Sequence, residues 1–144
     1  IEFELGARTH LGLHGFVSYS FQDAEDGVSK ERLTNSPTHV AKLGLAYQAS
    51  RHISFALQLV NESGRKTLYG TQTSSVLLTD ISVLIKPRIN TEKALLNLLS
   101  RMKCSFLVRN LFNARFETPG GLEHRQSAIQ QNERNYSLKL EYAF

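Results

Sequence analysis

Hydrophobic and polar residues alternate along much of this chain, and the alternation is most regular between Arg134 and Phe144. Apolar or aromatic residues occupy every second position there: Tyr136, Leu138, Leu140, Tyr142 and Phe144. The residues between them are polar or small. Because successive side chains of a β-strand point to opposite faces, this stretch predicts a strand with one apolar face and one polar face.

The same period of two recurs upstream and predicts about seven strands in all. The expected strands cover residues 1–9, 13–23, 38–49, 52–64, 75–87, 103–115 and 134–144. Most exceed the about 5 to 6 residues of a soluble strand and match the about 9 to 11 of a strand that crosses a membrane. We therefore expect an all-β fold, an antiparallel up-and-down transmembrane β-barrel segment. It is an incomplete barrel, since single-chain barrels need about eight strands.

The connections between the expected strands differ in length according to their order. Short turns fall at 9–13 and 49–52, and long polar loops fall at 23–37, 63–75 and 117–133. Outer-membrane barrels have short periplasmic turns and longer external loops. If the chain ends at the periplasmic rim, all three long loops are external and both short turns are periplasmic.

The link near 88–102 follows a different pattern. Its apolar residues are spaced as on one face of a helix: Leu95, Leu98, Leu99 and Met102. This spacing predicts a short amphipathic helix over 91–102 on the periplasmic side. A helix packed on its own protein is favoured over a helix that binds a partner.

Aromatic and charged residues sort along the strands in ways that suit a barrel wall. Aromatics gather near the expected periplasmic ends, as in an interfacial girdle: Tyr47, Phe55, Phe106, Tyr142 and Phe144. Charges of both signs fall on the other face: Glu4, Arg8, Lys42, Asp80, Lys86, Arg109, Lys139 and Glu141. Such charges are costly in a dry core, so we expect them to face a wet lumen and to pair across strands.

Composition narrows the class of protein further. The mean hydropathy of −0.26 and the absence of a long apolar run exclude a transmembrane helix but suit barrel strands, in which only alternate residues meet lipid. The net charge of +4 is spread along the chain, so no nucleic-acid interface is expected. The single Cys104 cannot form an internal disulfide. The N-terminus is not a signal peptide and starts in mid-strand, so an export signal is expected upstream.

Residues that could carry chemistry are few. No catalytic, cofactor-binding or metal-binding motif occurs, and we expect no enzyme. Four loop residues could contact an anionic ligand: Arg65, Lys66, His124 and Arg125. Ordinary loop charge is the favoured alternative for them.

Two stretches resemble parts of a known family. The final strand is similar to the C-terminal signal that the barrel-assembly machinery of bacteria reads in outer-membrane proteins. The stretch Val108 to Phe116 looks like the penultimate strand of TonB-dependent outer-membrane receptors, through Asn110, Leu111, Phe112 and Phe116, with Asn113 where that family usually has Asp. Residues 1–144 would then be the C-terminal part of such a receptor's barrel.

The resemblance implies the rest of the function. Receptors of that family have about 22 strands around a plugged lumen. They take up a ligand such as a ferric siderophore, haem or cobalamin, with energy supplied through TonB. It implies an outer-membrane location and contact with outer-membrane lipid. Two alternatives stay open from the residues alone: a passive pore or other barrel without TonB, and a soluble β-sandwich that binds a ligand.

Overall fold

The structure is a computed structural model, and it describes residues 1–28, 30–87 and 101–142. All of its regular elements are strands. They are β1 (Glu2–Arg8), β2 (Leu13–Phe21), β3 (His39–Gln48), β4 (Ile53–Glu62), β5 (Val76–Ile85), β6 (Met102–Arg109), β7 (Glu117–Pro119), β8 (Ala128–Gln130) and β9 (Asn135–Tyr142).

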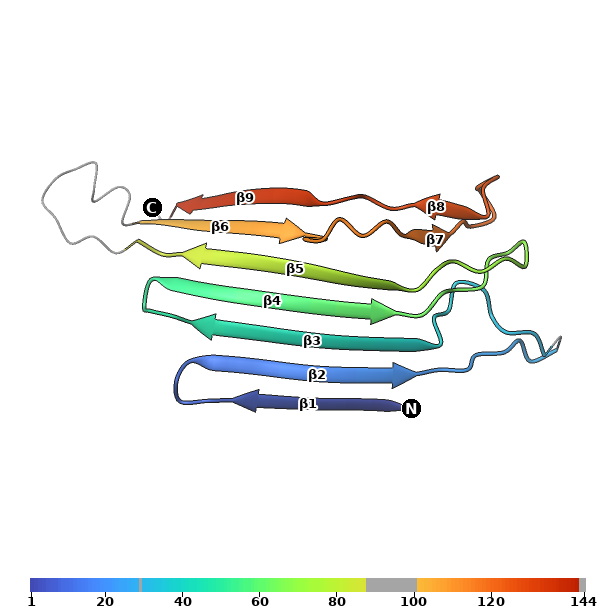
Figure 1. Cartoon of the computed structure of the whole chain (residues 1–144), viewed down its shortest axis with the longest axis horizontal. Coiled ribbons are helices and arrows are strands. Elements are labelled where there is room, and N and C mark those ends of the chain that lie inside the picture. Colours follow the sequence, from blue (N-terminus) through green and yellow to red (C-terminus); the bar gives the residue numbers. More distant parts are fainter. Residues whose placement is uncertain (29, 88–100, 143–144) are drawn as a thin grey trace, which may run out of the picture.

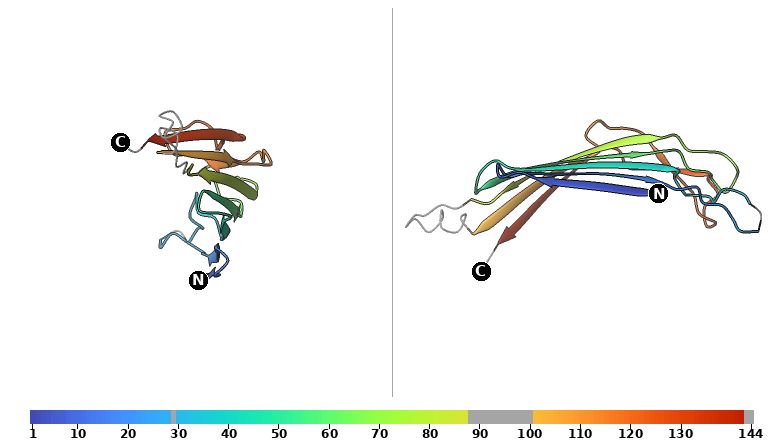
Figure 2. Two further views of the ribbon diagram at one scale, coloured as in Figure 1. Left: turned by 90° about the vertical axis from the view of Figure 1, so that its left-hand side faces the viewer. Right: turned by 90° about the horizontal axis from the view of Figure 1, so that it is seen from below.

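Seven of the strands form one antiparallel sheet in the order β1-β2-β3-β4-β5-β6-β9 (Figure 1). Each strand pairs with the next one along the sheet, so the topology is the up-and-down meander that the alternation predicts. The all-β class and the seven antiparallel strands are confirmed. The sheet bends into an arc and does not close on itself (Figure 2), and β1 and β9 are its two open edges.

The long and short connections lie at opposite ends of the sheet, as expected (Figure 1). The short turns β1–β2 and β3–β4 are held locally. In the first turn Gly12 has a φ of 78°, and the Thr9 N–H donates to the Leu13 carbonyl at 2.9 Å. In the second turn the Ser50 hydroxyl accepts the N–H groups of His52 and Ile53, each at 3.1 Å. These local contacts explain how so few residues can reverse the chain.

Two expectations about the C-terminal third are wrong. The strand expected over 103–115 ends at Arg109, because Asn110 and Asn113 adopt positive φ angles of 51° and 56°, outside the β region of regular strands. The loop expected over 117–133 contains the small antiparallel hairpin of β7 and β8. This hairpin continues the β6–β9 pair beyond the sheet (Figure 1).

The expected helix over 91–102 lies outside the described residues except for its last two. Arg101 is in a turn, and Met102 is already the first residue of β6, so a helix cannot extend to its predicted end. None of the described residues is helical.

The sheet is a single layer with almost no dry core. Among the described residues, Val108 is the only buried hydrophobic side chain. A soluble sandwich would instead place a second layer on the apolar face. The sheet therefore has two open faces, and their chemistry defines the candidate site.

Candidate functional site

The first face of the sheet is continuous and apolar. Register pairs place alternating residues of all seven strands on it, because directly paired residues share a face. One row across it contains Leu5, Val17, Leu43 and Leu59, and another contains Tyr47, Phe55, Val83, Phe106 and Leu138. Most of these side chains are exposed, with Leu138 at 64% and Phe55 at 45%, while Leu43, Leu59 and Val83 are half-buried. An apolar surface of this extent suits a lipid or protein environment and not water.

Aromatic side chains lie near both ends of this apolar face. Tyr47 and Phe55 are direct partners on β3 and β4, and Phe106 stacks on Tyr136 with their ring centroids 6.3 Å apart. These contacts lie toward the short-turn end, where the sequence predicts a girdle. Phe144, which belongs to the same prediction, lies outside the described residues.

A second aromatic cluster, not predicted from the sequence, lies at the loop end of the sheet. There the Tyr19 hydroxyl and the Nδ1 atom of His39 form a hydrogen bond of 2.7 Å. The Phe21 ring lies 5.2 Å from the His39 ring. The signal was present in the period of two, since Tyr19 and Phe21 share a face of β2. Only the register of β2 with β3 shows that His39 completes the group.

The second face carries the charged residues, as the alternation predicts. Lys139 and Glu141 of β9 form an ion pair on it, and Lys103 of β6 lies 4.0 Å from the same carboxylate. Near the first turn, the Arg8 Nε donates to the Nδ1 of His14 at 3.0 Å. Pairing across strands is therefore present for Glu141 with Lys103 and for Arg8 with His14, whereas the Lys139–Glu141 pair lies within β9. This face is polar.

The Asn110 to Ala114 turn is the most closely bonded part of the C-terminal third. The Asn110 side chain donates to the carbonyl of Ala114 and accepts its N–H, each at 2.8 Å, and is only 6% exposed. Asn110 N–H donates to the Asp80 carboxylate on β5, and Asn113 Oδ1 accepts the N–H of Arg134. The resemblance motif is thus a turn that ties β5 to the start of β9.

The rest of this motif differs in burial. Leu111 donates its N–H to the carbonyl of Thr79 at 2.7 Å. Phe112 is 74% exposed, and Phe116 directly precedes β7. The side-chain amides of Asn110 and Asn113 therefore hold the turn through hydrogen bonds, while the exposed Phe112 side chain can contact surroundings outside the sheet.

The last strand has the two-faced form that its sequence predicts. Tyr136, Leu138 and Leu140 lie on the apolar face, where they pair with Val108, Phe106 and Cys104 of β6. Tyr142 pairs with Met102. All of β9 is exposed, because its other edge has no partner among the described residues.

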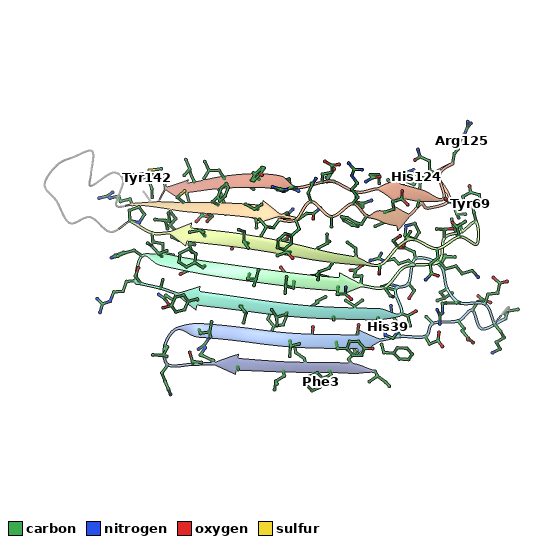
Figure 3. All side chains as sticks on the ribbon, in the orientation of Figure 1. Phe3, His39, Tyr69, His124, Arg125 and Tyr142 are labelled. Carbon is green, nitrogen blue, oxygen red and sulfur yellow. The ribbon has the colours of Figure 1, made fainter. Side chains whose placement is uncertain are left out.

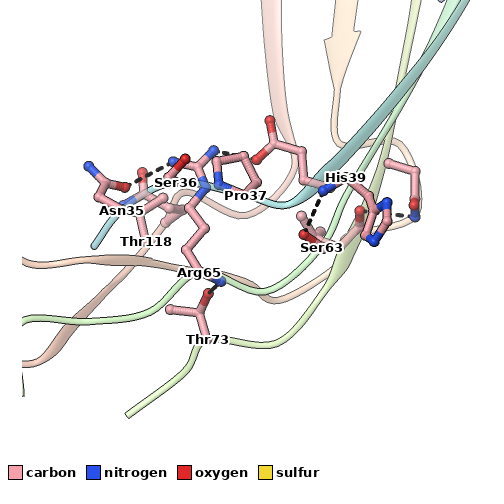
Figure 4. A network of polar contacts seen from close by, with 12 residues as sticks. Asn35, Ser36, Pro37, His39, Ser63, Arg65, Thr73 and Thr118 are labelled. Atoms are coloured by element: carbon pink, nitrogen blue, oxygen red, sulfur yellow. Dashed lines mark hydrogen bonds and ion pairs between the residues drawn. The ribbon is translucent and has the colours of Figure 1, made fainter. Parts of the chain in front are cut away.

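Two of the four candidate ligand-contact residues are already paired with other side chains. Arg65 forms an ion pair with Glu62 and donates to Asn35 Oδ1 at 3.1 Å (Figure 4). Lys66 forms an ion pair of 3.1 Å with Glu31. These contacts join the β4–β5 loop to the β2–β3 loop and explain both cations without a ligand.

The other two candidates lie in the β7–β8 loop, at the same end of the molecule (Figure 3). His124 Nε2 lies 3.3 Å from the carboxylate of Glu123. Arg125 has neither a hydrogen bond nor an ion pair within the part of the chain that the structure describes, and it projects from the tip of the loop (Figure 3). No hydrogen bond or ion pair between described residues joins these two to Arg65 or Lys66.

Comparison with known proteins adds no relative. No protein-family model, curated protein or solved structure matches the chain. Among the described residues, no helix is both long and apolar enough to span a membrane. Nor does any group of three or more His, Cys, Asp or Glu side chains in those residues form a candidate metal site. The class of protein is therefore stated from the sheet itself: an antiparallel meander with one apolar face and one polar face.

Proposed function

We propose that this chain is part of the wall of a bacterial outer-membrane β-barrel. The single observation that carries the proposal is the apolar face, which runs across all seven strands and which no layer of described residues covers. Lipid would cover that face, and the polar face would line the lumen. The long loops would be external and the short turns periplasmic.

We further propose that the complete barrel is a TonB-dependent receptor for a small ligand such as a ferric siderophore, haem or cobalamin. The support is the resemblance of the last strand and of the Asn110 to Phe116 stretch to that family. The side chains of Asn110 and Asn113 also form the hydrogen bonds of a turn, so the residues that carry the resemblance have a specific structural role.

The strand directions support a larger barrel. β1 and β9 run in the same direction, since each neighbouring pair in the seven-stranded sheet is antiparallel. A closed and fully antiparallel barrel therefore needs an odd number of additional strands between these two edges. A passive pore shares this requirement, so it remains the second candidate.

Fractionation of cells that express the full-length gene product tests the location. We expect the protein in the outer-membrane fraction, resistant to carbonate extraction and released by detergent. Recovery in the soluble fraction without detergent would contradict the barrel and favour a soluble ligand-binding fold.

Uptake assays separate the receptor from the passive pore. Cells are supplied with labelled ferric siderophores, haem or cobalamin, with and without a functional TonB protein. A receptor supports uptake of one of these ligands only when TonB is present. Uptake at the same rate in both strains would favour the pore.

A further inference from the structure

The polar face of the sheet has a depression with a volume of about 450 Å³. Its floor is formed by small residues of β3 and β4: Gly44, Ala46 and Ala56. Gly44 lies beside Phe16 of β2, and Ala46 lies beside Ala56. Gly44 is buried under the Phe16 ring, so the part of the floor that a flat group can approach is the exposed pair Ala46 and Ala56.

Apolar side chains stand on both sides of this floor. Phe16 leans over Gly44 so closely that a Cβ atom on this glycine would lie 2.2 Å from the Phe16 ring. Leu107 of β6 bounds the opposite side, next to its register partner Ser82. A flat apolar body fits between these walls and can stack against the Phe16 ring.

Side chains of both charge signs line the depression. Its cation is Arg109, whose side chain is exposed and makes neither a hydrogen bond nor an ion pair with any described residue. Asp80 lines it too, but one oxygen of its carboxylate already accepts the N–H of Asn110 at 2.9 Å. His14 on the far side is bonded to the Arg8 guanidinium. The guanidinium of Arg109 is therefore the charged group that a ligand can engage.

We propose that this depression binds an organic anion with a flat apolar body, whose carboxylate or similar group pairs with Arg109. The inference rests on the proposed function, because a barrel wall would turn this face toward an enclosed lumen. The proposed binding site lies on the wall of the barrel, away from the loop cations Arg65 and Lys66, which already form ion pairs.

A fluorescent carboxylate tests the proposal. The full-length protein, purified in a non-ionic detergent, is titrated with dansylglycine and, in parallel, with neutral dansylamide. We expect saturable binding of dansylglycine. Arg109→Gln should raise its Kd at least about tenfold, because the substitution removes a charge-assisted hydrogen bond to the carboxylate. Dansylamide should bind more weakly, and Arg109→Gln should not change its affinity.

Lys103→Gln is the matched control. Lys103 lies on the same strand and the same face as Arg109 but outside the depression. Its substitution by Gln removes one positive charge, as Arg109→Gln does. Its Kd for dansylglycine should change by less than about twofold. Ala56→Leu, which fills the floor with apolar atoms and leaves every charge in place, should weaken both probes.

Several outcomes would overturn the proposal. Absence of saturable binding would mean that this surface packs only against protein. Equal weakening by Arg109→Gln and Lys103→Gln would reduce the effect to general charge. If the Arg109→Gln protein fails to assemble, the wild-type protein alone gives the test. Equal affinity of the wild-type protein for dansylglycine and dansylamide would then contradict the proposal. Fractionation of the cells from which the protein is purified distinguishes a failure of this proposal from a failure of the proposed barrel. If the barrel proposal is wrong, the protein is recovered in the soluble fraction.

Discussion

At the scale of single residues, two features of this sheet depend on side-chain size or on an unusual backbone angle. Phe16 and Gly44 are register partners, and the ring occupies the space that a larger residue at 44 would need. Asn110 combines a positive φ with two side-chain hydrogen bonds to Ala114. Both arrangements predict specific effects of substitution.

Gly44→Ala should destabilise the folded protein by about 1–3 kcal/mol, because the new methyl group overlaps the Phe16 ring. In a Phe16→Ala background the same substitution should be close to neutral. Urea unfolding of the detergent-solubilised protein measures the cycle. Gly6→Ala is the control: Gly6 pairs with Phe16 from the other side, but the nearest atom to its added Cβ lies 3.8 Å away. Equal effects at Gly6 and Gly44 would show that ring overlap is not the cause.

Asn110→Ala should reduce stability by about 2–3 kcal/mol. It removes two hydrogen bonds of a buried side chain and places a residue with poor tolerance for positive φ at that position. Asn132→Ala, at an exposed position before β9, serves as the control in the same unfolding assay. The interpretation of the turn fails if the two substitutions have the same effect.

At the scale of elements, the long loops β2–β3 and β4–β5 behave as one unit. Arg65 bonds to Asn35, Lys66 pairs with Glu31, and the Asn35 N–H donates to the Lys66 carbonyl at 2.9 Å. At the base of the loops, His39 and Ser63 are also bonded to each other (Figure 4). A disturbance in one loop should therefore reach the other.

Arg65→Met should increase amide hydrogen exchange several-fold in both loops, residues 22–37 and 63–75, because it breaks the Arg65–Asn35 hydrogen bond that links them. Arg125→Met, at the tip of the β7–β8 loop, should leave exchange in both unchanged. Faster exchange confined to 63–75 would show that the loops move independently.

At the scale of the whole molecule, the two faces of the sheet predict opposite responses to charge. Val17 lies on the apolar face and its neighbour Ser18 on the polar face, where Lys42 is the register partner of Ser18. In a membrane, a lysine on the lipid side of a barrel strand costs about 2–4 kcal/mol near the midplane. A lysine on the lumen side meets water.

Val17→Lys should therefore lower the amount of folded protein in the outer membrane, whereas Ser18→Lys should change it little. The folded fraction is measured from the mobility difference between heated and unheated samples on gels. A loss of the same size for both variants would contradict the proposed sidedness of the sheet.

The sequence by itself determined the seven strands of the large sheet, their two faces and the separation of the short turns from the long loops. These are local properties: a period of two assigns each side chain of β1 to β5 and β9 to a face wherever the strand pairs. It also identified the Asn110 stretch as distinctive. It did not show that this stretch is a turn, because two asparagines at positive φ break a strand without changing its polarity pattern.

Only the tertiary structure decided the features that depend on register. Strand pairing brings Phe16 over Gly44, sets Ala46 beside Ala56, and leaves Arg109 unpaired at the edge of their depression. It also pairs Arg65 and Lys66 with residues of another loop. Contacts between residues far apart in sequence depend on the relative offset of the strands, which no periodicity within one strand encodes.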